Sequence, residues 1–114
     1  MKIAITAFED NLDSLISPQF CETNYFLIVD LDEVDNFKTV FNPHKKSMSG
    51  SDIFGAGLIV KNEVNALMTG NCTANASRIL HSAGIEVFEN MEGTVRENIV
   101  LMKEKFYNEL HLEY

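Results

Sequence analysis

The chain has 114 residues, of which 46% are hydrophobic, and its formal net charge is −8 at pH 7. This length predicts one domain spanning residues 1–114, with enough apolar side chains to form a core. A chain this acidic repels phosphate backbones and anionic lipids, so the charge argues against nucleic-acid-binding and membrane-binding proteins.

Three strands are predicted in the first part of the chain. Residues 3–7 are mostly apolar, which is typical of a central strand covered on both faces. A loop over 14–24 precedes an aromatic and β-branched run at 25–29, the most strand-like segment of the sequence. Residues 37–41 alternate in polarity as a half-buried edge strand does, and the short acidic connection before them predicts an antiparallel hairpin.

The second part of the chain alternates between helical and strand patterns. Ser51 is a candidate N-cap for the first helix, whose imperfect apolar face would consist of Ile53, Ala56, Leu58 and Val60. Thr94 and Glu97 have the spacing of a capping box, and the tail after residue 109 is expected to fray. The predicted elements are a helix over 52–62, a strand over 66–69, a helix ending at Gly84, a strand over 85–88 and a helix over 94–109.

The order of these elements predicts an α/β fold with a five-stranded mixed sheet. Right-handed crossovers place the fourth strand beside the first, on the side away from the hairpin. The strand order is then 3-2-1-4-5, with strand 2 antiparallel to the others. Ligands in such sheets bind at the carboxyl ends of the strands, where the strand order reverses.

The turn Gly70-Asn71-Cys72-Thr73 connects the fourth strand to its helix and is a candidate binding site. Asn71 or Thr73 can cap the helix. Backbone N–H groups at such a strand-to-helix turn attract anions and negatively charged clusters. We therefore expect ligand contacts from all four residues of this turn.

Several short motifs in matching order resemble the dinitrogenase iron–molybdenum cofactor-binding family, which includes NifX-like domains and the C-terminal domains of NifB proteins. The resemblance implies a three-layer α/β/α fold with a ribonuclease H-like motif. It also implies non-catalytic binding or carriage of a metal–sulfur cluster, such as the iron–molybdenum cofactor or a precursor, with cofactor-assembly or acceptor proteins as partners. The matching motifs are Lys2–Ile5, Tyr25-Phe26, Asn42-Pro43, Gly70-Asn71, Asn75-Ala76, Ala83–Ile85 and Gly93–Val95.

The chain departs from the family pattern in the loop before the second strand. Where the family commonly has His-Phe-Gly-Arg, this sequence has Gln19-Phe20-Cys21-Glu22, so the family's histidine and basic residue are both absent. A second cysteine, Cys72, replaces an apolar residue in the turn after the fourth strand.

The predicted topology brings Cys21, Cys72 and His44 to one pole of the sheet. Thiolate and imidazole are ligands preferred by soft metals and iron–sulfur clusters, so these three residues are candidate metal ligands. Two other interpretations stay open. The cysteines can be small core residues in a protein-interaction module with a degenerate metal site. Alternatively, Cys72 at a helix N-terminus can be the nucleophile of a thiol-dependent enzyme.

The remaining sequence features favour a protein that stays in solution. Two cysteines are too few for a disulfide scaffold, and the first residues lack the apolar length of a signal peptide. No apolar run reaches the length of a membrane-spanning helix. We therefore expect a cytoplasmic location with reduced thiols.

Overall fold

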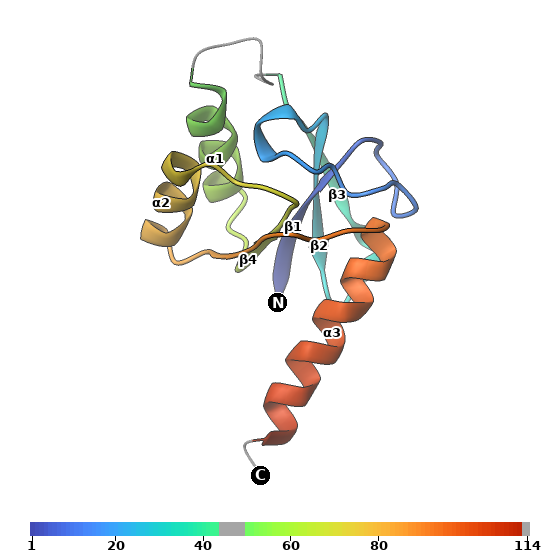
Figure 1. Ribbon diagram of the computed structural model, residues 1–114. Coiled ribbons are helices and arrows are strands. Elements are labelled where there is room, and N and C mark those ends of the chain that lie inside the picture. The colour runs from blue at the N-terminus through green and yellow to red at the C-terminus, as the bar shows by residue number, and fades with distance from the viewer. Residues whose placement is uncertain (44–49, 113–114) are drawn as a thin grey trace.

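The computed structural model describes residues 1–43 and 50–112, with side chains described up to residue 106. A five-stranded sheet lies between two layers of helices (Figure 1). The strands are β1 (Lys2–Ala7), β2 (Tyr25–Asp30), β3 (Lys38–Phe41), β4 (Ala66–Met68) and β5 (Glu86–Phe88). The helices are α1 (Ser51–Lys61), α2 (Ala74–Ser82) and α3 (Val95–Leu112), with short 3-10 turns η1 (Phe20–Glu22) and η2 (Val34–Asn36).

The strand order is β3-β2-β1-β4-β5, which confirms the predicted topology. β2 pairs antiparallel with both β1 and β3, whereas β1, β4 and β5 run parallel. The order reverses between β1 and β4, where Ile3 lies opposite Ala66 and Ile5 opposite Met68. The carboxyl ends of β1 and β4 therefore meet at one pole of the sheet, next to the start of β2.

Side chains on each strand alternate between two apolar cores. On β1, Ile3 and Ile5 pack on the α3 side, and Ala4 packs on the side of α1 and α2. On β4, Met68 packs on the α3 side, and Leu67 packs on the side of α1 and α2. This period of two explains why the central strands are mostly apolar on both faces, since each face is covered by helices.

The start of α1 differs from the prediction. Gly50, with a φ of 80°, is the N-cap, and Ser51 is the first helical residue. Of the expected apolar face, Ala56 is buried and Leu58 packs against the core, but Ile53 is 51% exposed and Val60 is also exposed, so those two assignments are wrong. The buried residues of the helix are Ser51, Gly55, Ala56 and Ile59. Glycine at position 55 lets Phe20 pack against the helix, since a Cβ there would lie 2.9 Å from the Phe20 ring.

Helix α3 covers the other face of the sheet and then extends past it (Figure 1). The predicted capping box is confirmed: Thr94 N–H donates to the Glu97 carboxylate at 3.0 Å, and Glu97 N–H donates to the Thr94 hydroxyl at 3.1 Å. Val95, Ile99 and Met102 form its buried stripe. The helix extends to Leu112, three residues beyond its expected end at residue 109.

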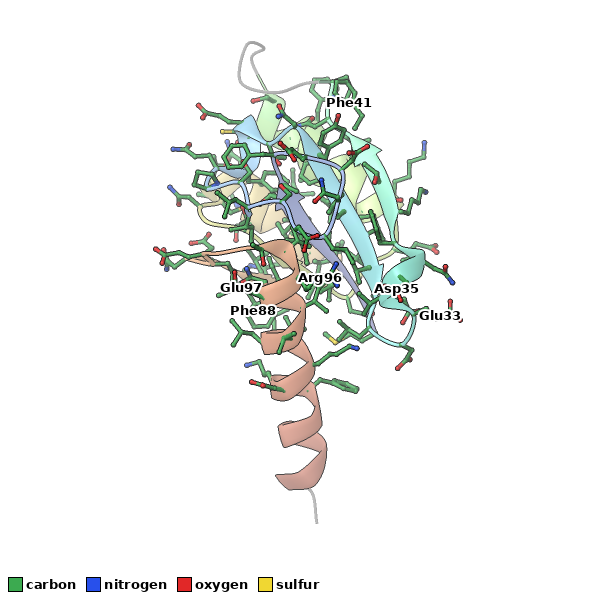
Figure 2. The ribbon with its side chains drawn as sticks, turned by 90° about the vertical axis from the view of Figure 1, so that its right-hand side faces the viewer. Glu33, Asp35, Phe41, Phe88, Arg96 and Glu97 are labelled. Carbon is green, nitrogen blue, oxygen red and sulfur yellow. The ribbon has the colours of Figure 1, made fainter. Side chains whose placement is uncertain are left out.

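The acidic turn between β2 and β3 lies at the pole opposite the carboxyl ends of β1 and β4. Figure 2 shows Glu33 and Asp35 at one end of the hairpin and Phe41 at the other. Phe41 lies opposite Tyr25, and their ring centroids are 5.9 Å apart. No helix in the described part of the chain is long and apolar enough to cross a membrane.

Candidate functional site

Three segments lie side by side at the carboxyl pole of the sheet. The middle segment is Gly70-Asn71, immediately after β4. On one side, Gln19 forms an isolated parallel bridge with Asn71, and Phe20 N–H donates to the Asn71 carbonyl at 2.9 Å. On the other side, Asn90 N–H donates to the Gly70 carbonyl at 2.7 Å. Backbone hydrogen bonds thus align residues that are far apart in the sequence.

The residue at position 70 must be glycine because the backbone of Pro18 lies against it. A Cβ at position 70 would lie 2.6 Å from the Pro18 Cα, closer than real Cβ atoms come to a backbone. The backbones of Pro18 and Gly70 can therefore cross only because residue 70 has no side chain. This crossing forms the floor of the cleft described next.

An open cleft lies over the three segments and has two lobes. The polar lobe, of about 400 Å³, is lined by Gln19, Asn71 and Asn90 together with Gly70. The apolar lobe, of about 270 Å³, is lined mainly by Phe8, Leu15, Ile16 and Pro18. The two lobes share Pro18, Met91 and Glu92 as lining residues, so they adjoin each other.

The polar lobe contains functional candidates that the sequence analysis did not select. Gln19, Asn71 and Asn90 are all exposed, and each contributes a neutral carboxamide from a different segment. Only Asn71 was expected to contact a ligand. Asn90 follows β5 with a φ of 62°, a backbone conformation that asparagine adopts more readily than most residues. Its place after a strand of the parallel sheet is the signal that could have identified it.

The loop over residues 90–94 forms one wall of the cleft and is held from below by α3. The buried Asn98 amide donates to the carbonyls of Glu92 and Thr94, both at 2.8 Å. Ile16 N–H donates to the Gly93 carbonyl at 2.8 Å, which ties this wall to the opposite one.

An ion pair on the surface also connects α3 to the loop after β1. Arg96 Nε lies 3.0 Å from the Asp13 carboxylate, and Figure 2 shows Arg96 and Glu97 at the start of the helix. Because both side chains are largely exposed, this pair contributes little stability on its own.

The two cysteines lie beside the cleft but do not line it. Cys21 belongs to η1 and Cys72 follows Asn71, so the Phe20–Asn71 hydrogen bond brings their segments together. Both thiols are half-buried and unbonded to each other. Cys72 packs against the core on the side of α1 and α2.

Burial raises the pKa of the Cys72 thiol to about 11, and the negative charges of Glu89, Asp52 and Cys21 act in the same direction. A thiol with this pKa is protonated at neutral pH, so it is a poor nucleophile in the absence of a cation. This argues against the thiol-dependent enzyme.

Thr73 rather than Asn71 is the N-cap of α2. Its hydroxyl accepts a hydrogen bond from Ala76 N–H at 3.2 Å and donates one to the Asp52 carboxylate at 2.7 Å. The Thr73 side chain, next to Cys72 in the sequence, therefore links the first turns of α1 and α2.

The described residues do not form a complete site for a bare metal ion. Among them, no three His, Cys, Asp or Glu side chains are grouped so as to hold one. His44, the third predicted ligand, lies outside the described residues. Cys21 and Cys72 are thus brought together, and their role as ligands stays a prediction.

A larger hollow, of about 560 Å³, lies on the outer side of α2. Its lining residues, which include Ser77, Arg78 and His81, all belong to that one helix. It is therefore a shallow helix surface rather than a cleft between elements. His81 is exposed, as the helical periodicity predicts.

The sequence and the fold both match known proteins. The chain is 29% identical over 106 residues to an uncharacterised protein of Methanocaldococcus jannaschii, covering 91% of this chain and 86% of the relative. The apo form of the orange protein from Desulfovibrio gigas has a TM-score of 0.86 and 30% identity, covering 91% of this chain and 88% of the other.

A Thermotoga structure named as a NifB protein has a TM-score of 0.77 and 28% identity, covering 90% of this chain and 87% of the other. The sequence model of the family described as dinitrogenase iron-molybdenum cofactor matches residues 1–105. This match spans all five strands and most of α3. The chain therefore belongs to the dinitrogenase iron–molybdenum cofactor family.

Proposed function

We propose that this protein binds and carries a metal–sulfur cluster, of the iron–molybdenum cofactor or precursor type, without catalysing a reaction on it. Membership of the family supports this proposal. So does the similarity to the orange protein, whose structure was determined as an apo form. The cargo-binding region is the pole where the carboxyl ends of β1 and β4 meet, with Gly70, Asn71, Cys72, Thr73 and Cys21 as its proposed contacts.

The observation that carries the proposal is the hydrogen bond from Phe20 N–H to the Asn71 carbonyl, at 2.9 Å. The segments that carry Cys21 and Cys72 are paired through it beside the open cleft, which supports both thiols as proposed ligands. Thiolates are the usual protein ligands of metal–sulfur clusters. The topology alone would allow any ligand at this pole, whereas a thiol on each of two paired segments favours a soft metal.

The chemistry of the site suits a preformed cluster better than a bare ion. Two thiols cannot complete the four-ligand shell of a structural zinc or iron site. A cluster arrives with sulfide ligands of its own, so it needs few ligands from the protein. The adjoining lobes, of about 400 and 270 Å³, provide space for its body.

Transfer to or from other proteins follows from a carrier role, so cofactor-assembly or acceptor proteins are the proposed partners. The cleft is open at the surface, and a bound cluster would stay accessible to them. The runner-up function is a protein-interaction module that has lost its cargo, and the absence of a three-ligand group among the described residues favours it.

Anaerobic reconstitution tests the proposal. The protein is incubated with ferrous iron and sulfide, or with the isolated cofactor, and then desalted. Bound metal, bound sulfide and the charge-transfer absorption are measured for the wild type, for Cys21→Ser, for Cys72→Ser and for the double variant. Serine keeps the size of the side chain and removes the soft donor.

We expect the wild type to retain metal and sulfide in a fixed ratio, and the double variant to retain much less. Uptake that is equal in the wild type and the double variant would refute the ligand role of the thiols. A wild type that retains neither metal nor sulfide would favour the protein-interaction module.

A further inference from the structure

The polar lobe of the cleft is lined by three carboxamides that have no hydrogen-bond partner among the described residues. No hydrogen bond within the part of the chain that the structure describes involves the side-chain amides of Gln19, Asn71 or Asn90. Each comes from a different segment, and the backbone hydrogen bonds at 2.9 and 2.7 Å hold the three segments in register. The amides are therefore positioned by the backbone and available to a ligand.

The charge of the lobe is unusual for an anion site. No Lys, Arg or His is among its lining residues in the described part of the chain, and Glu92 is the ionisable side chain there. Each carboxamide offers two N–H donors without carrying a charge. Hydrogen bonds from such donors to bridging or terminal sulfides are a known way for proteins to hold clusters and tune their potentials.

We propose that Gln19, Asn71 and Asn90 hold the sulfide surface of the cargo through N–H···S hydrogen bonds, while the apolar lobe contacts its poorly hydrated remainder. This inference rests on the proposed function and adds a second part to the site. The carboxamides recognise the body of the cluster, and the thiols lie beside it. The ligand class is a sulfide-terminated cluster or thiometallate.

The same carboxamides also have oxygen atoms, which together with the Glu92 carboxylate would suit a hard cation such as Ca²⁺. Two observations favour the sulfide-terminated ligand. The polar lobe, of about 400 Å³, is far larger than one ion needs, and it adjoins a lobe with apolar walls. A hard cation requires converging oxygens and gains nothing from the apolar walls.

The probe is tetrathiomolybdate, a soluble anion whose whole surface is sulfide, with molybdate as its oxygen counterpart. Binding is measured by anaerobic equilibrium dialysis and by the charge-transfer absorption of the thiometallate. The variants are Gln19→Met, Asn71→Leu and Asn90→Gly, which remove the amide, and glycine suits the positive φ at position 90. Asn36→Leu, in the exposed η2 far from the cleft, is the matched control.

Each cleft variant is expected to weaken tetrathiomolybdate binding about three- to tenfold, the effect of one lost hydrogen bond. The control is expected to leave binding unchanged, and molybdate is expected to bind more weakly than tetrathiomolybdate. Glu92→Gln is expected to strengthen binding, because it removes a negative charge and adds a donor. A thermal melt of every variant separates loss of binding from loss of folding.

The thiol variants distinguish this inference from the proposed function. Cys21→Ser/Cys72→Ser should still bind tetrathiomolybdate even if it fails to retain a reconstituted cluster. Tetrathiomolybdate binding that is absent in the wild type, or unchanged in all three amide variants, would overturn the inference. Calcium binding that is weakened by Glu92→Gln would overturn it as well, in favour of a hard-cation site.

Discussion

Gly70 lies against the backbone of Pro18 so closely that a Cβ at position 70 would come within 2.6 Å of the Pro18 Cα. This contact joins the loop before β2 to the end of β4 at the point where the strand order reverses. The carbonyl of the same glycine accepts a hydrogen bond from Asn90 N–H. Gly70 therefore contacts both walls of the cleft, the segment of Pro18 through its Cα and the segment of Asn90 through its carbonyl.

Gly70→Ala should be strongly destabilising. The added methyl group meets backbone atoms that cannot rotate away, and overpacking of this kind costs about 1–3 kcal/mol of unfolding free energy. Urea denaturation followed by circular dichroism measures the change.

Gly57→Ala is the matched control for this prediction. Gly57 is inside α1, and a Cβ there would have no heavy atom within 4 Å. Because alanine is a better helix former than glycine, this variant should gain about 0.5–1 kcal/mol. If Gly70→Ala were as stable as the wild type, the close crossing with Pro18 would not be a constraint on the fold.

Thr73→Ala should destabilise the protein by about 1 kcal/mol, since it removes the N-cap of α2. It also removes the hydrogen bond to Asp52, which links the first turns of α1 and α2. Thr73→Ser keeps the hydroxyl and should stay close to the wild type. Chemical denaturation of the three proteins compares them, and an equal loss in the serine variant would mean that the hydroxyl is not the stabilising group.

The topology was predictable because it depends on local signals. The apolar run of β1, the hairpin after it and the alternation that follows leave few arrangements once crossovers are right-handed. Errors arose where tertiary contacts override local patterns. Ile53 belongs to the apparent apolar stripe of α1 but is exposed. The helix instead turns the side that carries Gly55 towards the core, where the ring of Phe20 packs against it.

The candidate site was predictable only in part. The thiols of Cys21 and Cys72 could be assigned to one pole from strand directions alone. The group of three carboxamides could not be predicted, because it depends on two long-range pairings, of Gln19 with Asn71 and of Asn90 with Gly70. No periodicity in the sequence encodes them, and an isolated glutamine or asparagine in a loop resembles any other exposed polar residue.

Asn98→Asp should destabilise the protein in a pH-dependent manner. The buried amide donates to two carbonyls at 2.8 Å, and a carboxylate in its place would face those oxygens without a donor. We expect a loss of about 3 kcal/mol at neutral pH. Because burial would raise the folded-state pKa of the new carboxyl group, stability should recover as the pH falls below that value.

Denaturation between pH 4 and 8 measures this effect, with the exposed Asn36→Asp as the control. The control adds the same charge at the surface and should change stability by no more than about 0.5 kcal/mol at any pH. A loss in Asn98→Asp that does not vary with pH would indicate a steric rather than an electrostatic cause.

The pKa of about 11 at Cys72 should be visible in its reaction with iodoacetamide. Only the thiolate reacts, so the alkylation rate should rise about tenfold per pH unit from pH 8 to 10, without a plateau. Glu89→Gln should shift this profile to lower pH, because it removes one of the charges that disfavour the thiolate. Mass spectrometry of the labelled peptides separates Cys72 from Cys21.

The same pKa predicts how stability changes at alkaline pH. The folded-state pKa lies above the ordinary thiol value of 9.0, so Cys72 in the folded protein holds its proton at pH values where the unfolded chain loses it. The free energy of unfolding should therefore decrease as the pH rises from 9 towards 11, and this decrease should be smaller in Cys72→Ser. An alkylation rate that levels off near pH 7 would instead indicate a low-pKa thiolate, and would revive the thiol-dependent enzyme as the function of this pole.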